Sequence, residues 1–480
     1  MPEVISVIKL RLNPDAETAR QLDGQSKKCN WLYNHLLEHA NQLRERYRAE
    51  PSDEIAKVLY TSRGLRNLVP GLKEEHPFLK TVHSSSLKNA ALRLSDCIQT
   101  YQKSHKGKRK GKITGWPSFR PWKAKWFSLF YDEPNKGFRI SNQTLCLSLG
   151  TGEDKKRHAL SIPLKDSSVL SSKDIRSLRI VKQAGVFSAV LTVTRQLPEP
   201  TPIKRVIALD PNHKNFAYGV DNQGKAIEIE RPWWLKRYDQ RIDEIKSKRD
   251  SKQKKSHMIE TPGGKYYKSS RRYQKLNQTL ERVLAKRREQ TKVFMHTLAN
   301  RLCKDYDLVS MGDYTPHGGG ITTPMRRSMN NQSLIGRFKE VANWTTQKSG
   351  KHFAEFDEKG TTRTCHHCNH VVQGGIKPNL RTWICESCQT HHIRDENAAI
   401  NGLRRILRDW SQKCSELSEP VPGSGPELKQ ILVQERWVWR VGPRGVHCAP
   451  RGTCSSSMNN RQKIKQRAWQ PSIRFEQVSV

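Results

Sequence analysis

The sequence predicts an α/β protein of several domains, and three observations support this. The chain has 480 residues, enough for about two to four domains of ordinary size. Its first half contains helical patterns followed by short runs of alternating apolar and polar residues, while its second half mixes apolar strands with long helices. Two Cys-x-x-Cys pairs interrupt that second half, which indicates an inserted metal-binding module.

The charge balance indicates a nucleic-acid partner. Lysine and arginine number 86 against 46 acidic residues, giving a net charge of +40 spread along the whole chain. Such an excess repels itself unless a polyanion neutralises it, and phosphate backbones do so with release of counterions. An anionic membrane surface is a weaker alternative. We expect no membrane partner, because no run of about 18 apolar residues is present.

The cysteine count and the chain start favour a cytoplasmic, nucleoid-associated location in a prokaryote. There are 11 cysteines, an odd number, and only four of them cluster, which is typical of metal binding in a reducing compartment. The first residues lack the basic and apolar regions of a secretory signal. We expect a monomer.

Elements of the first half follow from periodicity. Residues 4–12 predict a strand, and helical patterns cover 16–48, 53–67 and 84–101. Short alternating runs between 116 and 197 predict an antiparallel barrel or sandwich. The Pro-rich stretch 198–202 predicts a domain boundary.

Elements of the second half alternate strands with helices. Strands are expected at 206–209, 216–220, 308–311 and 352–357, and helices at 234–248, 271–303, 331–348 and 397–410. After residue 418 the periodicity is lost and Pro, Gly, Ser and basic residues dominate. This predicts a mostly disordered end.

The cysteine pairs predict a structural zinc site. Two Cys-x-x-Cys knuckles aim four thiolates at one point, which gives closed tetrahedral coordination with no open position for catalysis. Four histidines nearby are alternative ligands, but four thiolates are the simpler set. The predicted zinc ligands are Cys365, Cys368, Cys385 and Cys388.

Two separated acids predict a magnesium site. Asp210 ends an apolar strand, and Asp395 stands at the start of a helix just after the cysteine pairs. Two-metal phosphodiesterases hold Mg²⁺ on shared carboxylates placed in this way. Taken singly, a strand-end aspartate is often a turn former and Asp395 is a plausible helix cap, so it is their conjunction with the cysteines that favours catalysis.

The second half resembles the TnpB family and, through it, the small type V CRISPR effectors. Three stretches carry the resemblance: Ile207–Ala217 resembles the first RuvC motif, Thr361–Cys388 the zinc ribbon, and Arg394–Asn401 the third RuvC motif. The resemblance implies an RNase H-like (RuvC) nuclease domain with an inserted zinc ribbon, preceded by a β-barrel wedge domain that carries a helical recognition insert.

The resemblance also implies domain boundaries. The wedge barrel is expected at 1–15 and 106–202, with the helical recognition insert at 16–105. The nuclease domain is expected at 203–360 and 393–412, with the zinc ribbon at 361–392 and a basic, mostly disordered tail at 413–480.

One departure from the family concerns the middle catalytic acid. The second RuvC motif of the family ends a strand with Glu-Asp-Leu, but here Gly312 stands in the place of the glutamate. Asp313 is one replacement, although neighbouring strand residues point to opposite faces. The next strand offers Glu355, Asp357 and Glu358, of which we favour Glu358 and then Glu355. The last alternative is an incomplete site that binds without cutting.

The family implies an RNA-guided DNA endonuclease with a guide RNA, double-stranded target DNA, structural Zn²⁺ and catalytic Mg²⁺. The other hypotheses are a guide-dependent DNA-binding protein with an inactive site, a zinc-ribbon transposition accessory protein and a protein-only transposase. Basic residues near aromatic or Gly-rich stretches are expected to contact nucleic acid; these are Lys123, Lys125, Arg326, Arg327 and Arg337.

Overall fold

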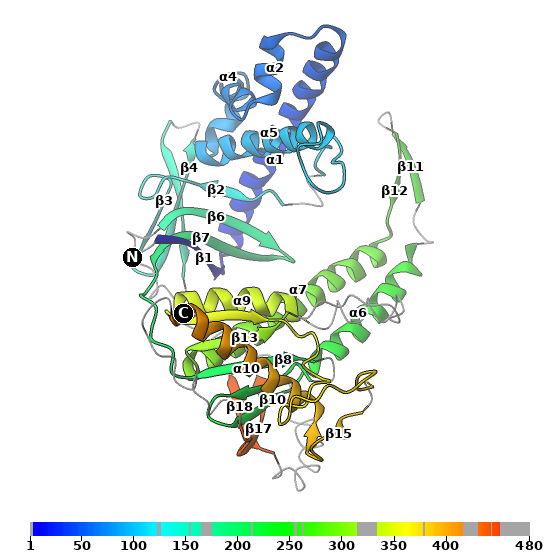
Figure 1. Cartoon of the computed structure of the whole chain (residues 1–480). Coiled ribbons are helices and arrows are strands. Elements are labelled where there is room, and N and C mark those ends of the chain that lie inside the picture. Colours follow the sequence, from blue (N-terminus) through cyan, green and yellow to red (C-terminus); the bar gives the residue numbers. More distant parts are fainter. Residues whose placement is uncertain are drawn as a thin grey trace. The chain divides into compact units, whose positions relative to one another are not determined.

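The computed structural model describes residues 3–121, 126–152, 155–164, 175–212, 215–253, 257–261, 264–313, 334–377, 380–415, 431–442 and 444–451. The chain divides into two compact units, Pro2–Gln196 and the part from Leu197 onward (Figure 1). Among the described residues, no helix has the length and apolar character needed to cross a membrane.

The amino-terminal unit combines a helical insert with two antiparallel sheets. Its helices are α1 (Ala16–Ala49), α2 (Asp53–Tyr60), α3 (Gly64–Asn67), α4 (Val69–Glu75), the 3-10 helix η1 (Pro77–Thr81) and α5 (Ser84–His105). Its strands are β1 (Glu3–Leu12), β2 (Leu129–Tyr131), β3 (Phe138–Ser141), β4 (Thr144–Thr151), β5 (Arg157–Pro163), β6 (Ile175–Gln183) and β7 (Val186–Gln196).

The two sheets share one hydrophobic core with the helices. Their strand orders are β1-β7-β6-β2 and β3-β4-β5, and every pairing is antiparallel. Leu36 of α1, Leu145 of β4 and Leu191 of β7 are fully buried in the same cluster. The described residues therefore form two sheets around a common core, and the wedge β-barrel that the resemblance implies is not confirmed.

The second unit is built on a seven-stranded sheet. Its strands are β8 (Val206–Pro211), β9 (Ala217–Asp221), β10 (Lys225–Ile229), β13 (Leu308–Gly312), β14 (His352–Phe356), β17 (Glu435–Gly442) and β18 (Gly445–Pro450), in the order β14-β13-β8-β9-β10-β17-β18. Strands β8, β9 and β10 pair antiparallel, whereas β13 runs parallel to both β8 and β14. This order of five strands, from β10 to β14, is that of RNase H-like folds.

Alternation along the strands divides the sheet into two apolar faces. Val206 and Ala208 pack with helix α10 (Arg394–Ser415), while Ile207 and Leu209 pack with α7 (Arg271–Asp305) and α9 (Ile335–Lys348). Side chains two apart share a face of a strand. Asp210, two residues after Ala208, therefore belongs to the face that α10 covers.

Two long basic helices extend from the second unit. Helix α6 (Trp234–Asp250) packs against α7 through a small cluster that includes Ile242 and Val283. The short hairpin of β11 (His257–Thr261) and β12 (Gly264–Lys268) joins the two helices (Figure 1). The helices predicted at 234–248 and 271–303 are thus confirmed, and each is two residues longer than expected.

The prediction of a mostly disordered tail is wrong for residues 435–450. Strand β17 pairs parallel with β10 and antiparallel with β18, so the hairpin extends the sheet of the second unit. Trp437, Trp439 and Val441 alternate along β17 and pack on the α7 face, where Trp439 is fully buried. This period of two is a strand signal, but the polar composition of the surrounding sequence obscured it.

Helix α10 fits against the sheet at a glycine, which gives a stability prediction. A Cβ on Gly402 would lie 2.4 Å from Cζ of the buried Phe356 ring. Alanine in place of a mid-helix glycine usually adds about 1 kcal/mol of stability, but here we expect Gly402→Ala to lose about 1–3 kcal/mol through overpacking. The midpoint of urea unfolding measures this loss of stability.

The control is Gly24→Ala in α1, where the added methyl meets open space. This variant should be neutral or stabilising. An equal gain of stability in Gly402→Ala would contradict the close packing of α10 on Phe356.

Candidate acidic site and metal centre

Asp210 and Asp395 lie together on the α10 side of the sheet. Asp210 is the penultimate residue of β8, and Asp395 is the second residue of α10 with an exposure of 8%. The two carboxylates are close enough to interact electrostatically. Acids that are 185 positions apart in sequence (395 minus 210) thus meet because α10 crosses β8 at this point.

The carboxylate of Glu358 fills the space that Gly312 leaves. A Cβ built on Gly312 would lie 1.9 Å from Oε1 of Glu358 and 2.5 Å from its Cδ, so no side chain fits at 312 while Glu358 holds this position. Gly312 pairs with Phe356 across the parallel strands β13 and β14. Glu358 lies two residues beyond Phe356, the last residue of β14. Gly312 shares its face of β13 with Leu308, which packs in the α10 cluster, so the contact at Gly312 places the Glu358 carboxylate on the side of Asp210.

The other candidates for the middle acid are engaged elsewhere. Glu355 forms an ion pair of 2.6 Å with Lys339 of α9, on the opposite side of the sheet from α10. Asp313 is exposed and accepts a hydrogen bond of 3.1 Å from the backbone N–H of Glu358. Asp357 lies 3.8 Å from Arg405 and is largely exposed. Of the four acids considered for this role, Glu358 is the one whose carboxylate interacts with Asp210.

Burial and crowding shift the electrostatics of this acidic cluster. Burial raises the pKa of Asp210 well above its usual value, and the nearby carboxylates of Glu358 and Asp395 raise it further, while Arg394 opposes the rise. Like charges that share a site cannot all ionise unless a cation balances them. Oxygen ligands are those that Mg²⁺ prefers. Asp210, Glu358 and Asp395 interact electrostatically and are candidate ligands of a divalent cation. Among the described residues, however, only the four cysteines bring their ligand atoms within 4.8 Å of one another, so the three carboxylates would have to draw closer around such an ion.

Two neighbours of Asp395 were not predicted from the sequence. Nδ2 of Asn212 donates to Oδ2 of Asp395 at 2.6 Å, and Arg381 donates to the two carboxylate oxygens at 3.3 and 3.2 Å. Asn212 follows β8, so its place two residues after Asp210 was a usable signal. Arg381 immediately precedes β15 (Thr382–Ile384) of the cysteine module, and nothing in its sequence context indicated this contact.

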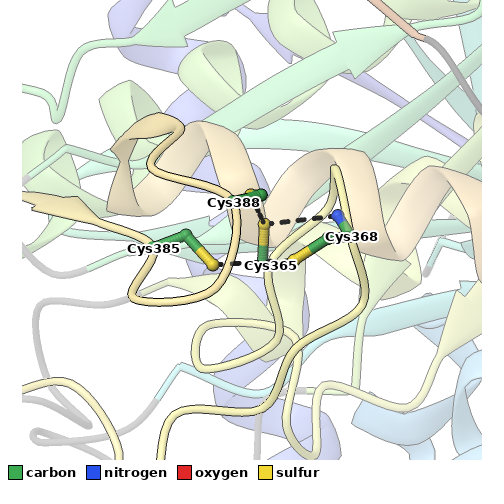
Figure 2. A group of neighbouring side chains, drawn as sticks. All are labelled: Cys365, Cys368, Cys385 and Cys388. Atoms are coloured by element: carbon green, nitrogen blue, oxygen red, sulfur yellow. Dashed lines mark hydrogen bonds between the residues drawn. The ribbon is translucent and has the colours of Figure 1, made fainter.

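The four predicted cysteines form one cluster with their sulfurs directed at one another (Figure 2). Their Sγ atoms all lie within 4.8 Å of each other, and the Cys365–Cys388 and Cys368–Cys385 separations are both 3.6 Å. A tetrahedral site with Zn–S bonds of about 2.3 Å requires sulfurs about 3.8 Å apart. The geometry therefore fits a zinc ion bound by four sulfurs.

The two knuckles share one backbone design. In each, the residue after the second cysteine has a left-handed conformation, with φ of 62° at Asn369 and 59° at Gln389. The N–H of that residue donates to the first cysteine's carbonyl at 2.9 Å in both cases. Burial raises the pKa of the Cys365 thiol to about 12, so a buried thiolate needs a bound cation.

The neighbouring histidines have their own partners. His392 lies on β16 (His391–Ile393), and its Nε2 is 3.1 Å from Sγ of Cys365. At this distance a protonated Nε2 donates a hydrogen bond to the thiolate. His366 hydrogen-bonds through Nδ1 to Oδ1 of Asn397. Both histidines are therefore placed as hydrogen-bonding neighbours of the four sulfur ligands rather than as ligands themselves.

Two asparagines of α10 hydrogen-bond the cysteine module to the helix that carries Asp395. Nδ2 of Asn397 donates to the carbonyls of Thr361 and Thr364, and Nδ2 of Asn401 donates to the same two carbonyls. Asn397 is almost fully buried and lies two residues from Asp395. The module and the acid are therefore anchored on the same turns of one helix.

The predicted nucleic-acid contacts are mostly outside the described residues. Arg337 lies on α9 and is exposed. The other four, which are Lys123, Lys125, Arg326 and Arg327, fall in stretches that the structure does not describe.

The model of the Cas12f1-like TNB domain family matches residues 336–402, which run from α9 through the cysteine module into α10. The CRISPR-associated DNA-binding protein Cas12m of Allomeiothermus silvanus is 29% identical over 136 residues, which are 28% of this chain and 25% of that protein. A Mycobacterium tuberculosis protein, named as a candidate RNA-guided DNA endonuclease, is 22% identical over 64% of this chain and 65% of its own length.

A TnpB-like protein of Acanthamoeba polyphaga mimivirus is 25% identical over 30% of this chain and 28% of that protein. The chain thus spans between a quarter and two thirds of these relatives. Among solved structures, the Cas12f1 chain of a complex with sgRNA and target DNA aligns with a TM-score of 0.45 and 10% identity, over 83% of this chain and 98% of that one.

The sequence matches agree with the motifs found along the chain. The strand-end Asp210, the four-cysteine module and the helix-start Asp395 occur in the order described above for TnpB proteins. The matched relatives include TnpB-like proteins, and the matched family model covers the cysteine module together with Asp395. The family model and these relatives together support the assignment of this chain to the TnpB family.

Proposed function

We propose that the protein is an Mg²⁺-dependent, RNA-guided DNA endonuclease in which Asp210, Glu358 and Asp395 hold the catalytic metal ions. One observation carries the proposal. The carboxylate of Glu358 occupies the space that a side chain at Gly312 would need, beside Asp210. A glutamate supplied by the next strand thus compensates for a glycine in the place of the family's middle acid.

The proposed chemistry is hydrolysis of a DNA phosphodiester. Bound Mg²⁺ would activate water and stabilise the leaving oxygen. The chain's own residues hold the carboxylates in place: Asn212 orients one oxygen of Asp395, and the backbone N–H of Glu358 is fixed by Asp313. The cysteine cluster would hold a structural Zn²⁺ that keeps Arg381 and the knuckles against α10.

Guide RNA and double-stranded target DNA are the proposed partners. The net charge of +40 suits a protein that neutralises many phosphates. In RNA-guided systems base pairing reads the sequence, while the protein reads a short flanking motif and the shape of the backbone. The names of the mycobacterial and Cas12 relatives agree with this class of partner.

A second candidate is a guide-dependent DNA-binding protein that does not cut. Asp395 is already ion-paired with Arg381, which competes with a metal for the same oxygens. The Cas12m relative is itself named as a DNA-binding protein. This candidate requires that the arginine stays in place when Mg²⁺ and DNA are bound.

Plasmid cleavage separates the two. The protein is expressed with its flanking genomic DNA, the copurified RNA is sequenced, and the complex is rebuilt with a guide directed at a plasmid carrying a library of flanking motifs. Guide-dependent cutting in Mg²⁺ that is lost in Asp210→Ala supports the nuclease. Guide-dependent retention of the plasmid without cutting supports the second candidate, and absence of copurified RNA would overturn both.

A further inference from the structure

A hydrogen-bonded network next to the two aspartates links two buried side chains to an arginine whose side chain is 40% exposed. It joins Tyr218 of β9, Glu396 of α10 and Arg436 of β17. Arg436 donates from Nε to Oε2 of Glu396 and from a terminal nitrogen to Oε1, both at 2.9 Å. The Tyr218 hydroxyl donates to Oε2 of Glu396 at 2.8 Å. Such two-point guanidinium–carboxylate contacts fix orientation as well as distance.

Each of the two aspartates has a neighbour in this network. Glu396 follows Asp395 in the first turn of α10. Tyr218 is directly opposite Asp210 in the antiparallel pairing of β8 with β9, where facing side chains lie on the same side of the sheet. The network therefore fixes the backbone beside Asp395 and the strand opposite Asp210, and it does not use the carboxylate of either aspartate.

The environment makes this network hard to replace. Glu396 is 7% exposed and Tyr218 is 2% exposed. Burial and the carboxylate of Glu396 raise the pKa of Tyr218 above its usual value, so its hydroxyl remains a donor at neutral pH. A buried carboxylate that loses one of its partners is left as an uncompensated charge, and the first turn of α10 would then move to reach water.

Arg436 is held in place by the carboxy-terminal hairpin. It is paired with Ala226 in the parallel register of β10 and β17. Three residues further on, Trp439 is fully buried in the core beneath α7. The strand is thus anchored on one face of the sheet and presents Arg436 to α10 on the other.

We infer that Arg436 is a positioning residue for the metal site, and that the hairpin of β17 and β18 is an integral part of the nuclease unit. The inference rests on the proposed function, since it assumes that Asp210 and Asp395 bind a divalent cation. Arg436 acts on that cation only through Glu396 and Tyr218. Outer-shell partners of this kind typically change metal affinity about 10- to 100-fold when they are removed.

The test measures Mn²⁺ binding to the full chain, with zinc loaded and without nucleic acid, by the electron paramagnetic resonance signal of free Mn²⁺. Arg436→Met is expected to raise the Kd about tenfold. The matched control is Arg440→Met, on the same strand, which removes a similar ion pair of 3.0 Å with the more exposed Glu230; its Kd should equal that of the wild type. Arg436→Lys keeps the charge but loses the two-point contact, so an intermediate Kd is expected.

The outcomes separate this inference from the proposed function. A Mn²⁺ site that is lost in Asp210→Ala but unchanged in Arg436→Met overturns the inference and leaves the nuclease proposal standing. A wild-type chain with no Asp210-dependent Mn²⁺ site overturns both. If Arg436→Met does not fold, as judged by circular dichroism and zinc content, Arg436→Lys takes its place, and a wild-type Kd in that variant overturns the inference.

Discussion

Replacing Glu358 by glutamine is expected to reduce guide-dependent DNA cleavage by about 10²–10³-fold, the loss typical when one group that stabilises transition-state charge is removed. Glutamine keeps the size and shape of the side chain but not its charge, so the fold around Gly312 should be unaffected. The rate of plasmid linearisation under single-turnover conditions measures the change. Binding of the target, measured by gel shift, should remain within about twofold.

The matched control lies on β14, the strand that immediately precedes Glu358. Glu355→Gln removes a carboxylate three residues earlier, which is ion-paired with Lys339 on the α9 side of the sheet. Its cleavage rate should stay close to that of the wild type. Equal losses in the two variants would show that general charge, rather than the position of Glu358, decides activity, and an active Glu358→Gln would remove this residue from the proposed site.

The space shared by Gly312 and Glu358 allows a sharper test of the same site. Gly312→Ala puts a methyl group where the carboxylate of Glu358 lies, so cleavage should fall although no acid is removed. The double variant Gly312→Glu with Glu358→Gly returns the acid to β13, the strand that carries it in the family. We expect this double variant to cut faster than either Glu358→Gln or Gly312→Ala. A double variant slower than both would mean that β13 cannot present a carboxylate to Asp210.

Periodicity and spacing were enough to predict much of the fold. The strands around Asp210 and Gly312, the two long basic helices and the cysteine cluster all follow from local patterns, because each depends on residues close together in sequence. The preference for Glu358 over Glu355 came from its nearness to the strand end. The contact of the Glu358 carboxylate with the Cβ position of Gly312, and the ion pair of Glu355 with Lys339 on the α9 side, agree with that preference.

Other features depended on contacts that no local pattern contains. The pairing of β17 with β10 joins residues about 210 positions apart, as in Trp439 opposite Ile229, so only the tertiary fold brings them together. The contact of Arg381 with Asp395 likewise depends on how the cysteine module folds back on α10. The alternation of Trp437, Trp439 and Val441 was readable in the sequence, but the expectation of a disordered end outweighed it.

Removal of zinc is expected to abolish cleavage even when Mg²⁺ is plentiful. Structural zinc binds zinc-finger peptides with apparent free energies of about 10–16 kcal/mol at neutral pH, and we expect much of the cysteine module's order to depend on an energy of that size. Without the ion, four buried or half-buried sulfurs repel one another or become protonated. The carbonyls of Thr361 and Thr364 would then leave Asn397, whose helix carries Asp395.

Chelation and repletion measure this dependence. After treatment with a strong chelator and its removal, Mg²⁺ alone should not restore plasmid cleavage, whereas Zn²⁺ followed by Mg²⁺ should. Cys385→Ser should likewise lose both the bound zinc and the activity, while Cys97→Ser, an exposed cysteine on α5 far from the cluster in sequence, should keep one zinc per chain and full activity. Full activity in a zinc-free chain with Mg²⁺ would mean that α10 holds Asp395 in place without the module, and that the asparagine contacts serve the module alone.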